Sequence, residues 1–273
     1  MSTTERPTGT PGHRPPGEPG SVRPSGRSVI AAVVVSAVLG LVIWRVGLPD
    51  DVQLFGTPAS TLTVPIALLV ALTGISIGGA LTRRGRWRVV DIVVASVLGV
   101  VGGFFFWAVA VSWEPLTLAL KLAPPSAALL GGLWLVPGVL GGLIICKPGA
   151  AVYVELVAAV LEALLGNQWG FSTVYYGLIE GLGAEFVLAL LFYRSFGLVP
   201  ALLSGAGAGF ALGLLDTSVW YPDLPPGTKI WYVVFAMLSG AVIAGGGAWA
   251  LTRALARTGA LAPLASGRSA ERV

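Results

Sequence analysis

Four glutamates stand among almost entirely apolar residues in the stretch Gly131–Glu185 of this 273-residue chain. They are Glu155, Glu162, Glu180 and Glu185. An ionised carboxylate inside a membrane helix costs several kcal/mol unless it is paired, hydrated or protonated, so each is a candidate functional residue. We predict that the four build a pocket for a small polar, cationic ligand.

The spacing of the glutamates predicts how they are arranged. Glu155 and Glu162 are seven residues apart, so they lie about 20° apart on one helix face. Glu155 and Glu185 are expected at similar depth, with Glu162 near the outer mouth and Glu180 near the middle. Two alternatives remain open: protonated glutamates hydrogen-bonded between helices, or a pathway for protons or cations.

Aromatic and amide side chains are interleaved with these carboxylates. The further candidate binding residues are Trp134, Asn167, Gln168, Trp169, Tyr175 and Tyr176. Aromatic rings stack on flat or cationic groups, which favours a role in binding. The alternatives are a belt of Trp and Tyr at the membrane interface and, for Trp134, ordinary packing.

The composition predicts an all-α integral membrane protein. The chain is 55% hydrophobic and 11% charged, whereas about 25% of the residues of a soluble domain are charged. A single cysteine, Cys146, excludes a disulfide within the chain, and the only histidine, His13, lies in a Pro-rich segment. We therefore expect no metal and no cofactor. The sequence contains neither a GxxxxGK[ST] nor a GxSxG motif, so we expect no ATP hydrolysis or serine-protease chemistry.

Eight apolar runs are long enough to span a bilayer, for which about 20 residues are needed. They cover residues 28–47, 61–82, 89–111, 126–146, 149–166, 172–193, 198–215 and 230–252. The predicted organisation is a disordered cytoplasmic tail (1–27), two additional transmembrane helices (28–85), a six-helix core (86–253) and a cytoplasmic C-terminal tail (254–273).

The basic residues predict the orientation of the chain in the membrane. If the N-terminus is cytoplasmic, 14 of the 17 Lys and Arg residues fall in inner segments and three in outer segments. The positive-inside rule favours this arrangement, with both termini cytoplasmic. The net charge of +4 is therefore an orientation signal and does not indicate a nucleic-acid surface.

Two further patterns bear on function. Ala95, Gly99 and Gly103 form a stripe of small residues on one helix, which is typical of close helix contact; ordinary internal packing is the alternative. Asp216 and Asp223 accompany an outer loop rich in proline and aromatic residues, TSVWYPDLPPG, which is a candidate lid.

The segments LWLVPGVLGGLIICKPGAAVYVELVAAVLEALLGNQWG and YYGLIEGLGAE resemble a known family. From about Trp87 to Arg253 the chain is similar to the YkoE-type substrate-binding (S) components of energy-coupling factor (ECF) transporters. These belong to the class of ABC transporters associated with thiamine and its hydroxymethylpyrimidine precursor. The shared motifs are KPGAA, E-x6-E, LLG-x2-WG and GLGAE. The first two predicted helices lie outside the resemblance.

The resemblance implies a six-helix bundle that binds a vitamin from outside the cell membrane and performs no catalysis. It also implies partners, namely a transmembrane T component and two cytoplasmic ATP-binding subunits. The small residues of the family's coupling helix would correspond to Ala95, Gly99 and Gly103. The alternative from another class is a stand-alone proton- or cation-coupled carrier of a small cationic solute, which intramembrane carboxylates also suit.

Overall fold

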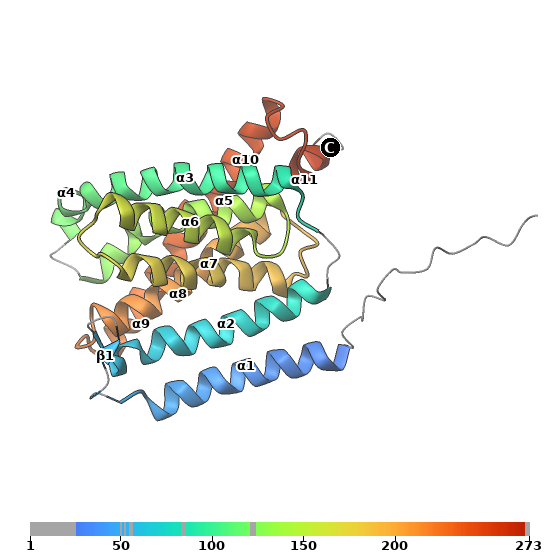
Figure 1. Ribbon diagram of the computed structural model, residues 1–273. Coiled ribbons are helices and arrows are strands. Elements are labelled where there is room, and N and C mark those ends of the chain that lie inside the picture. The colour runs from blue at the N-terminus through green and yellow to red at the C-terminus, as the bar shows by residue number, and fades with distance from the viewer. Residues whose placement is uncertain are drawn as a thin grey trace, which may run out of the picture.

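Helices form nearly all of the structure, a computed structural model that describes residues 26–49, 51, 53–54, 57–82, 86–120 and 124–270 (Figure 1). The tail predicted at residues 1–27 lies outside these residues except for its last two. The predicted all-α membrane fold is confirmed. The strands found among the described residues, β1 (Gln53–Leu54) and β2 (Thr57–Pro58), have two residues each and pair antiparallel.

Two helices precede the rest of the bundle, as the hydropathy predicts. Helix α1 (Gly26–Val46) packs along α2 (Thr63–Thr82), which follows a short 3-10 turn, η1 (Ala59–Leu62). Helix α2 in turn contacts α7 and α8, so the pair lies along one side of the bundle (Figure 1). Gly40 makes the close approach of α1 possible, because an added Cβ would lie 2.7 Å from the carbonyl oxygen of Ala67.

The remaining helices form the bundle that holds the core. In chain order they are α3 (Val89–Val111), α4 (Trp113–Thr117), the 3-10 segments η2 (Leu118–Leu120) and η3 (Pro124–Leu135), α5 (Val136–Ile145), α6 (Ala150–Leu165), α7 (Ser172–Leu190), α8 (Leu198–Val219), α9 (Pro226–Ser239), the π-helical segment η4 (Gly240–Gly246), α10 (Gly247–Arg257) and α11 (Ala265–Ala270). Helix α3 packs on α6, α6 on α7, α7 on α8, and α8 on α9 and η4.

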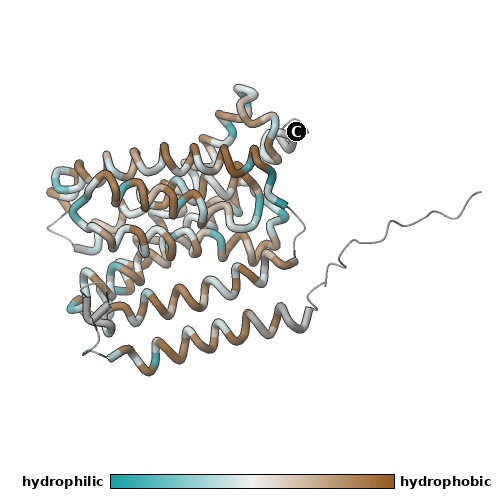
Figure 2. Tube along the Cα trace, in the orientation of Figure 1, coloured by the Kyte–Doolittle hydropathy of each residue, from teal (hydrophilic) through white to brown (hydrophobic). Residues whose placement is uncertain are grey.

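The described residues contain five helical segments that are long and apolar enough to cross a membrane. They are Val89–Val111, Pro125–Ile145, Ser172–Leu190, Leu198–Val219 and Pro226–Arg257. Helices α1 and α2 carry shorter apolar stretches, and α6 has 16 residues that include two glutamates. Most strongly hydrophilic residues lie near helix ends and in loops (Figure 2). The chain is therefore a multi-pass membrane protein.

Small residues bring the helices of the bundle close together. An added Cβ on Gly213 would lie 2.8 Å from the Cα of Val233, and one on Gly183 would lie 2.7 Å from the carbonyl oxygen of Gly207. Ala201 and Ala208 are essentially fully buried on the same helix, α8. Contacts of this kind replace the hydrophobic driving force that membrane helices lack.

The stripe proposed as a coupling surface lies inside the bundle. Ala95 is fully buried, and an added Cβ on Gly99 or Gly103 would meet Val157 or Leu161 of α6. The structure therefore places Gly99 and Gly103 in the α3–α6 contact and buries Ala95, which is the internal-packing alternative. The face of α3 that is exposed carries larger residues, such as Val97 and Val101.

The C-terminal segment is packed against the bundle. Leu261 and Leu264 are buried, and the Ser266 hydroxyl donates a 2.8 Å hydrogen bond to the carbonyl oxygen of Ile144 in α5. The described part of the predicted tail thus covers the end of α5.

Candidate functional site

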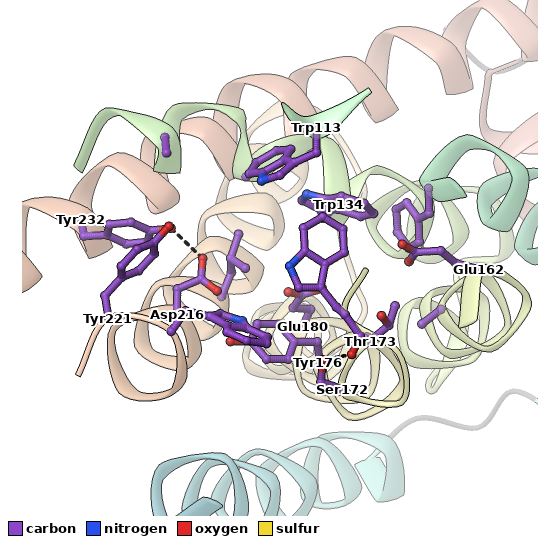
Figure 3. A pocket seen from close by; sticks show the side chains of 18 residues that line it. Trp113, Trp134, Glu162, Ser172, Thr173, Tyr176, Glu180, Asp216, Tyr221 and Tyr232 are labelled. Carbon is purple, nitrogen blue, oxygen red and sulfur yellow. Dashed lines mark hydrogen bonds between the residues drawn. The ribbon is translucent and has the colours of Figure 1, made fainter. Parts of the chain in front are cut away.

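A pocket of about 320 Å³ lies at the end of the bundle where α3 ends and α7 begins. Ligand pockets typically measure about 300–1,000 Å³, so this one has the size for a small molecule. Its walls come from α3, α4, η3, α6, α7, α8, α9 and the two loops after α6 and α8 (Figure 3). The residues that line it are Phe106, Trp113, Ala127, Gly131, Trp134, Ala159, Glu162, Trp169, Ser172, Thr173, Tyr176, Gly177, Glu180, Leu212, Asp216, Trp220, Tyr221 and Tyr232.

Three tryptophans form the centre of one wall. The ring centroids of Trp134 and Trp169 are 5.3 Å apart with perpendicular planes, and Trp113 lies 6.0 Å from each. Phe106 extends the cluster, 5.3 Å from Trp134. Edge-to-face geometry fixes the rings against one another and leaves faces available for a flat ligand. Trp134 and Trp169 were predicted from the sequence, whereas Trp113 was not.

The loop after α6 places Trp169 in this wall. Asn167 Oδ1 accepts hydrogen bonds from the backbone N–H groups of Trp169 (2.9 Å) and Gly170 (2.7 Å), and Asn167 Nδ2 donates to Thr173 Oγ1 (2.9 Å). Gly170 has a φ of +58°, which favours glycine. Asn167 therefore shapes the loop and does not line the pocket. Gln168 is exposed and outside the lining, which corrects the placement expected for both residues.

A second group of polar and aromatic side chains forms the opposite wall. The Tyr232 hydroxyl donates a 2.8 Å hydrogen bond to Asp216 Oδ2, and the rings of Tyr221 and Tyr232 are 5.4 Å apart. Burial, and then the charge of Asp216, raises the pKa of Tyr221. Sequence reasoning did not place Asp216, Tyr221 or Tyr232 in the site. The available signal was the loop TSVWYPDLPPG, which contains Tyr221 and directly follows Asp216.

Two of the four predicted glutamates lie at the pocket wall. Glu162 is fully buried, and neither of its carboxylate oxygens accepts a well-formed hydrogen bond from the described residues, although the amide of Asn167 lies close to the carboxylate. Glu180 is 4% exposed and lies one turn from Tyr176, whose hydroxyl lies near Asp216 but forms no well-formed hydrogen bond in the described part of the chain. A buried polar group without a partner is costly. These groups are therefore available to a ligand that donates hydrogen bonds or carries positive charge.

The other two glutamates bind the beginnings of helices. Glu155 Oε2 accepts a 2.5 Å hydrogen bond from the N–H of Gly138 in the first turn of α5. Glu185 accepts hydrogen bonds from Gly149 (2.6 Å) and Ala151 (3.0 Å) at the start of α6. The N–H groups of a first helical turn have no partner within the helix, which explains these contacts.

The placement predicted for Glu155 and Glu185 therefore needs correction, because neither lines the pocket. Tyr175 is also outside the lining, and its ring packs 5.4 Å from that of Tyr176. Tyr176 itself lines the pocket.

Comparison with known proteins identifies the bundle. Residues 90–211 match the model of the family described as "ABC-type cobalt transport system, permease component". The chain is 32% identical over 183 residues to the "Putative HMP/thiamine permease protein YkoE" of Bacillus subtilis (strain 168), covering 67% of this chain and 91% of that protein. A solved structure, "Crystal structure of an S-component of ECF transporter", is similar with a TM-score of 0.64 and 31% identity, covering 68% of this chain and 94% of that one.

These relatives are non-catalytic subunits of membrane transporters. The residues matched by the family model, 90–211, lie within the bundle, which agrees with the resemblance found in the sequence from about Trp87 onwards. The chain therefore belongs to the YkoE-type family of S-components of energy-coupling factor transporters.

Proposed function

We propose that this S-component captures thiamine or its hydroxymethylpyrimidine precursor in the tryptophan-lined pocket. One observation carries the proposal: Glu162 is fully buried at the wall of the pocket, and its carboxylate accepts no well-formed hydrogen bond from the described residues. The printed name of the Bacillus subtilis relative, an HMP/thiamine permease, supports the same ligand class.

The chemistry of the pocket matches a flat ligand that has both a cationic and a hydrogen-bonding end. Thiamine carries a thiazolium cation and an aminopyrimidine. Carboxylates such as Glu162 and Glu180 accept hydrogen bonds from an amino group and balance positive charge, with about twice the strength of neutral pairs. The faces of Trp134 and Trp169 stack on aromatic or cationic rings.

The proposal extends to the orientation and the partners. The distribution of basic residues favours cytoplasmic termini in the plasma membrane, and on that topology the pocket opens to the outside. Membership of the S-component family implies delivery of the ligand through a transmembrane T component energised by two ATP-binding subunits. The described residues supply the ligand pocket of such a complex.

Isothermal titration calorimetry on the purified chain tests the proposal with thiamine and hydroxymethylpyrimidine as titrants. Glu162→Gln keeps the shape of the side chain and removes its charge, so we expect binding to weaken by at least about tenfold, the equivalent of about 1.4 kcal/mol. The matched control is Asp223→Asn, which removes an exposed acid outside the pocket. Unchanged affinity of the Glu162 variant, or no binding of either titrant by the natural chain, would refute the proposal.

Vesicle experiments separate this function from that of a stand-alone carrier. Vesicles that hold the chain alone are compared with vesicles that also hold a T component and ATP-binding subunits. Uptake of labelled thiamine should require the added subunits and ATP. Uptake by the chain alone, driven by a proton gradient, would instead identify a secondary carrier.

A further inference from the structure

A second hollow, separate from the pocket, lies between the first two helices and the bundle. It measures about 860 Å³ and is bounded by α1 and α2 on one side and by α8 and α9 on the other. It shares no lining residue with the tryptophan-lined pocket, because α8 presents Leu212 and Asp216 to the pocket and Phe210 and Leu214 to the hollow. We call this second hollow the hairpin groove.

The walls of the hairpin groove are apolar. Ala37, Leu41, Leu68 and Val233 are among the residues that line it. The two hydroxyl groups on its α8 wall are already satisfied within the helix: Thr217 Oγ1 donates to the carbonyl oxygen of Gly213 (2.7 Å), and Ser218 Oγ to that of Leu214 (2.6 Å). The groove therefore offers hydrocarbon contacts along its length.

Positive charge gathers at one end of the groove. Lys229 lines this end, and its ammonium donates a 2.7 Å hydrogen bond to the carbonyl oxygen of Pro222. Its two other N–H donors have no hydrogen-bond partner within the described part of the chain. Trp44 lines the same end, and the guanidinium of Arg45 lies 5.8 Å from the centroid of its ring. Neither cation forms an ion pair with a carboxylate of the described residues, although Asp51 and Asp223 are exposed nearby in sequence.

The length of the hairpin groove indicates which kind of molecule can occupy it. From Ala37 to Trp44 on α1, and from Phe210 to Ser218 on α8, it extends roughly 10–12 Å at 1.5 Å per residue. A hydrocarbon core of ~30 Å has leaflets of ~15 Å, so the groove lies within one leaflet. A spanning helix of a partner needs the full ~30 Å, which is more than twice the length of the groove. The groove therefore accommodates most of the acyl chain of one leaflet, and its cationic end lies where the headgroup would be at the membrane surface.

We propose that the hairpin groove binds an acyl chain of an anionic phospholipid, with the headgroup phosphate held by Lys229 and Arg45. On the orientation favoured by the basic residues, this site faces the outer leaflet. The bound lipid joins α1 and α2 to α8 and α9, and so couples the two additional helices to the same helix, α8, that carries Asp216 of the pocket.

Native mass spectrometry of the purified full chain tests this site. The chain is titrated in detergent with palmitoyl-oleoyl phosphatidylglycerol and, separately, with phosphatidylcholine of the same acyl composition. We expect one phosphatidylglycerol to bind about tenfold or more tightly than phosphatidylcholine, because each cation near a lipid surface contributes about a fivefold preference for negative charge. Arg45→Gln with Lys229→Gln should abolish the preference. Ala37→Trp, which fills the groove, should weaken both lipids.

Matched controls place the change elsewhere on the surface. Arg257→Gln removes a cation beyond the other end of the bundle, and Val101→Trp enlarges an exposed residue of α3; neither should alter binding. If the two lipids bind equally well, the bound lipid is only annular lipid without a specific site. If Ala37→Trp still binds phosphatidylglycerol as the natural chain does, the lipid binds outside the hairpin groove. A lipid-free dimer that Ala37→Trp dissociates makes the groove an interface between copies. Each of these results overturns the proposal. The charge variants alone suffice if Ala37→Trp fails to fold.

Discussion

Tyr232 on α9 donates a 2.8 Å hydrogen bond to Asp216 near the end of α8. Both residues line the pocket, so this bond links two of the helices that form its wall. We predict that Tyr232→Phe weakens thiamine binding about tenfold or more, because hydrogen bonds to charged groups contribute about 1.5–3 kcal/mol and Asp216 would lose the partner that orients it. Calorimetry measures the dissociation constant.

Tyr153→Phe is the matched control for this prediction. Its hydroxyl lies 2.7 Å from that of Ser96, and it is not among the residues that line the pocket. Equal weakening by the two variants would mean that a general loss of packing, and not the Asp216 contact, is responsible.

Glu185 has a structural role that can be separated from ligand binding. Its carboxylate accepts the N–H groups of Gly149 and Ala151, so Glu185→Ala leaves two donors at the start of α6 without a partner. We expect a loss of about 1–3 kcal/mol in unfolding free energy. The thiamine dissociation constant should stay within the error of the calorimetry. Thermal unfolding in detergent measures the first effect. A large loss of affinity with unchanged stability would return Glu185 to the ligand site.

Much of the fold follows from the sequence, because bilayer thickness fixes the length of apolar helices. The predicted runs 89–111 and 172–193 correspond to α3 (Val89–Val111) and α7 (Ser172–Leu190). Hydropathy carries no signal for the breaks within a run. The segment before α5 is a 3-10 helix up to Leu135, and the last long helix contains a π-helical segment.

The site was harder to predict than the fold, because a carboxylate in an apolar helix has two different explanations. Glu162 accepts no well-formed hydrogen bond from the described residues and lines the pocket, whereas Glu155, on the same face of α6, binds the first turn of α5. Helical spacing cannot separate these cases, since the difference depends on where a neighbouring helix begins. Tyr232 was missed for a related reason: only the packing of α9 on α8 brings it to Asp216.

The small-residue stripe of α3 gives a prediction that separates its two interpretations. Gly99→Leu should destabilise the isolated chain, because even its Cβ would lie 2.6 Å from Val157 Cγ1. Overpacking of this kind typically costs about 1–3 kcal/mol. Thermal unfolding of the chain alone measures it. The control is Val97→Leu on the exposed face of the same helix, which should be neutral.

The opposite result has a clear meaning for Gly99. If Gly99→Leu leaves stability unchanged but abolishes ATP-dependent uptake with the partner subunits present, the stripe is a coupling surface and the α3–α6 packing described above is incorrect.

Asp91 lies at the other end of α3 from the pocket and joins three segments of the chain. It is 1% exposed, accepts hydrogen bonds from the backbone (2.7 Å) and the Nη2 (3.0 Å) of Arg88, and pairs with Lys147 after α5. Arg88 also donates to the carbonyl oxygen of Pro263 (2.9 Å). Removing one partner of a buried ion pair typically costs about 3–5 kcal/mol, so we expect Asp91→Ala to destabilise the chain strongly. Arg88→Gln should cost much less, because the Arg88 side chain is 46% exposed and water can replace it.

Thermal unfolding of the two variants tests this order. The double variant Asp91→Ala with Lys147→Met should recover part of the loss, because it removes the ammonium left without its partner; Lys147 is only 14% exposed. Thiamine affinity should remain unchanged throughout, since this cluster and the pocket lie at opposite ends of α3. An additive double variant would show that Asp91 and Lys147 act independently, and the ion pair would then contribute nothing to holding α3 against the α5–α6 turn.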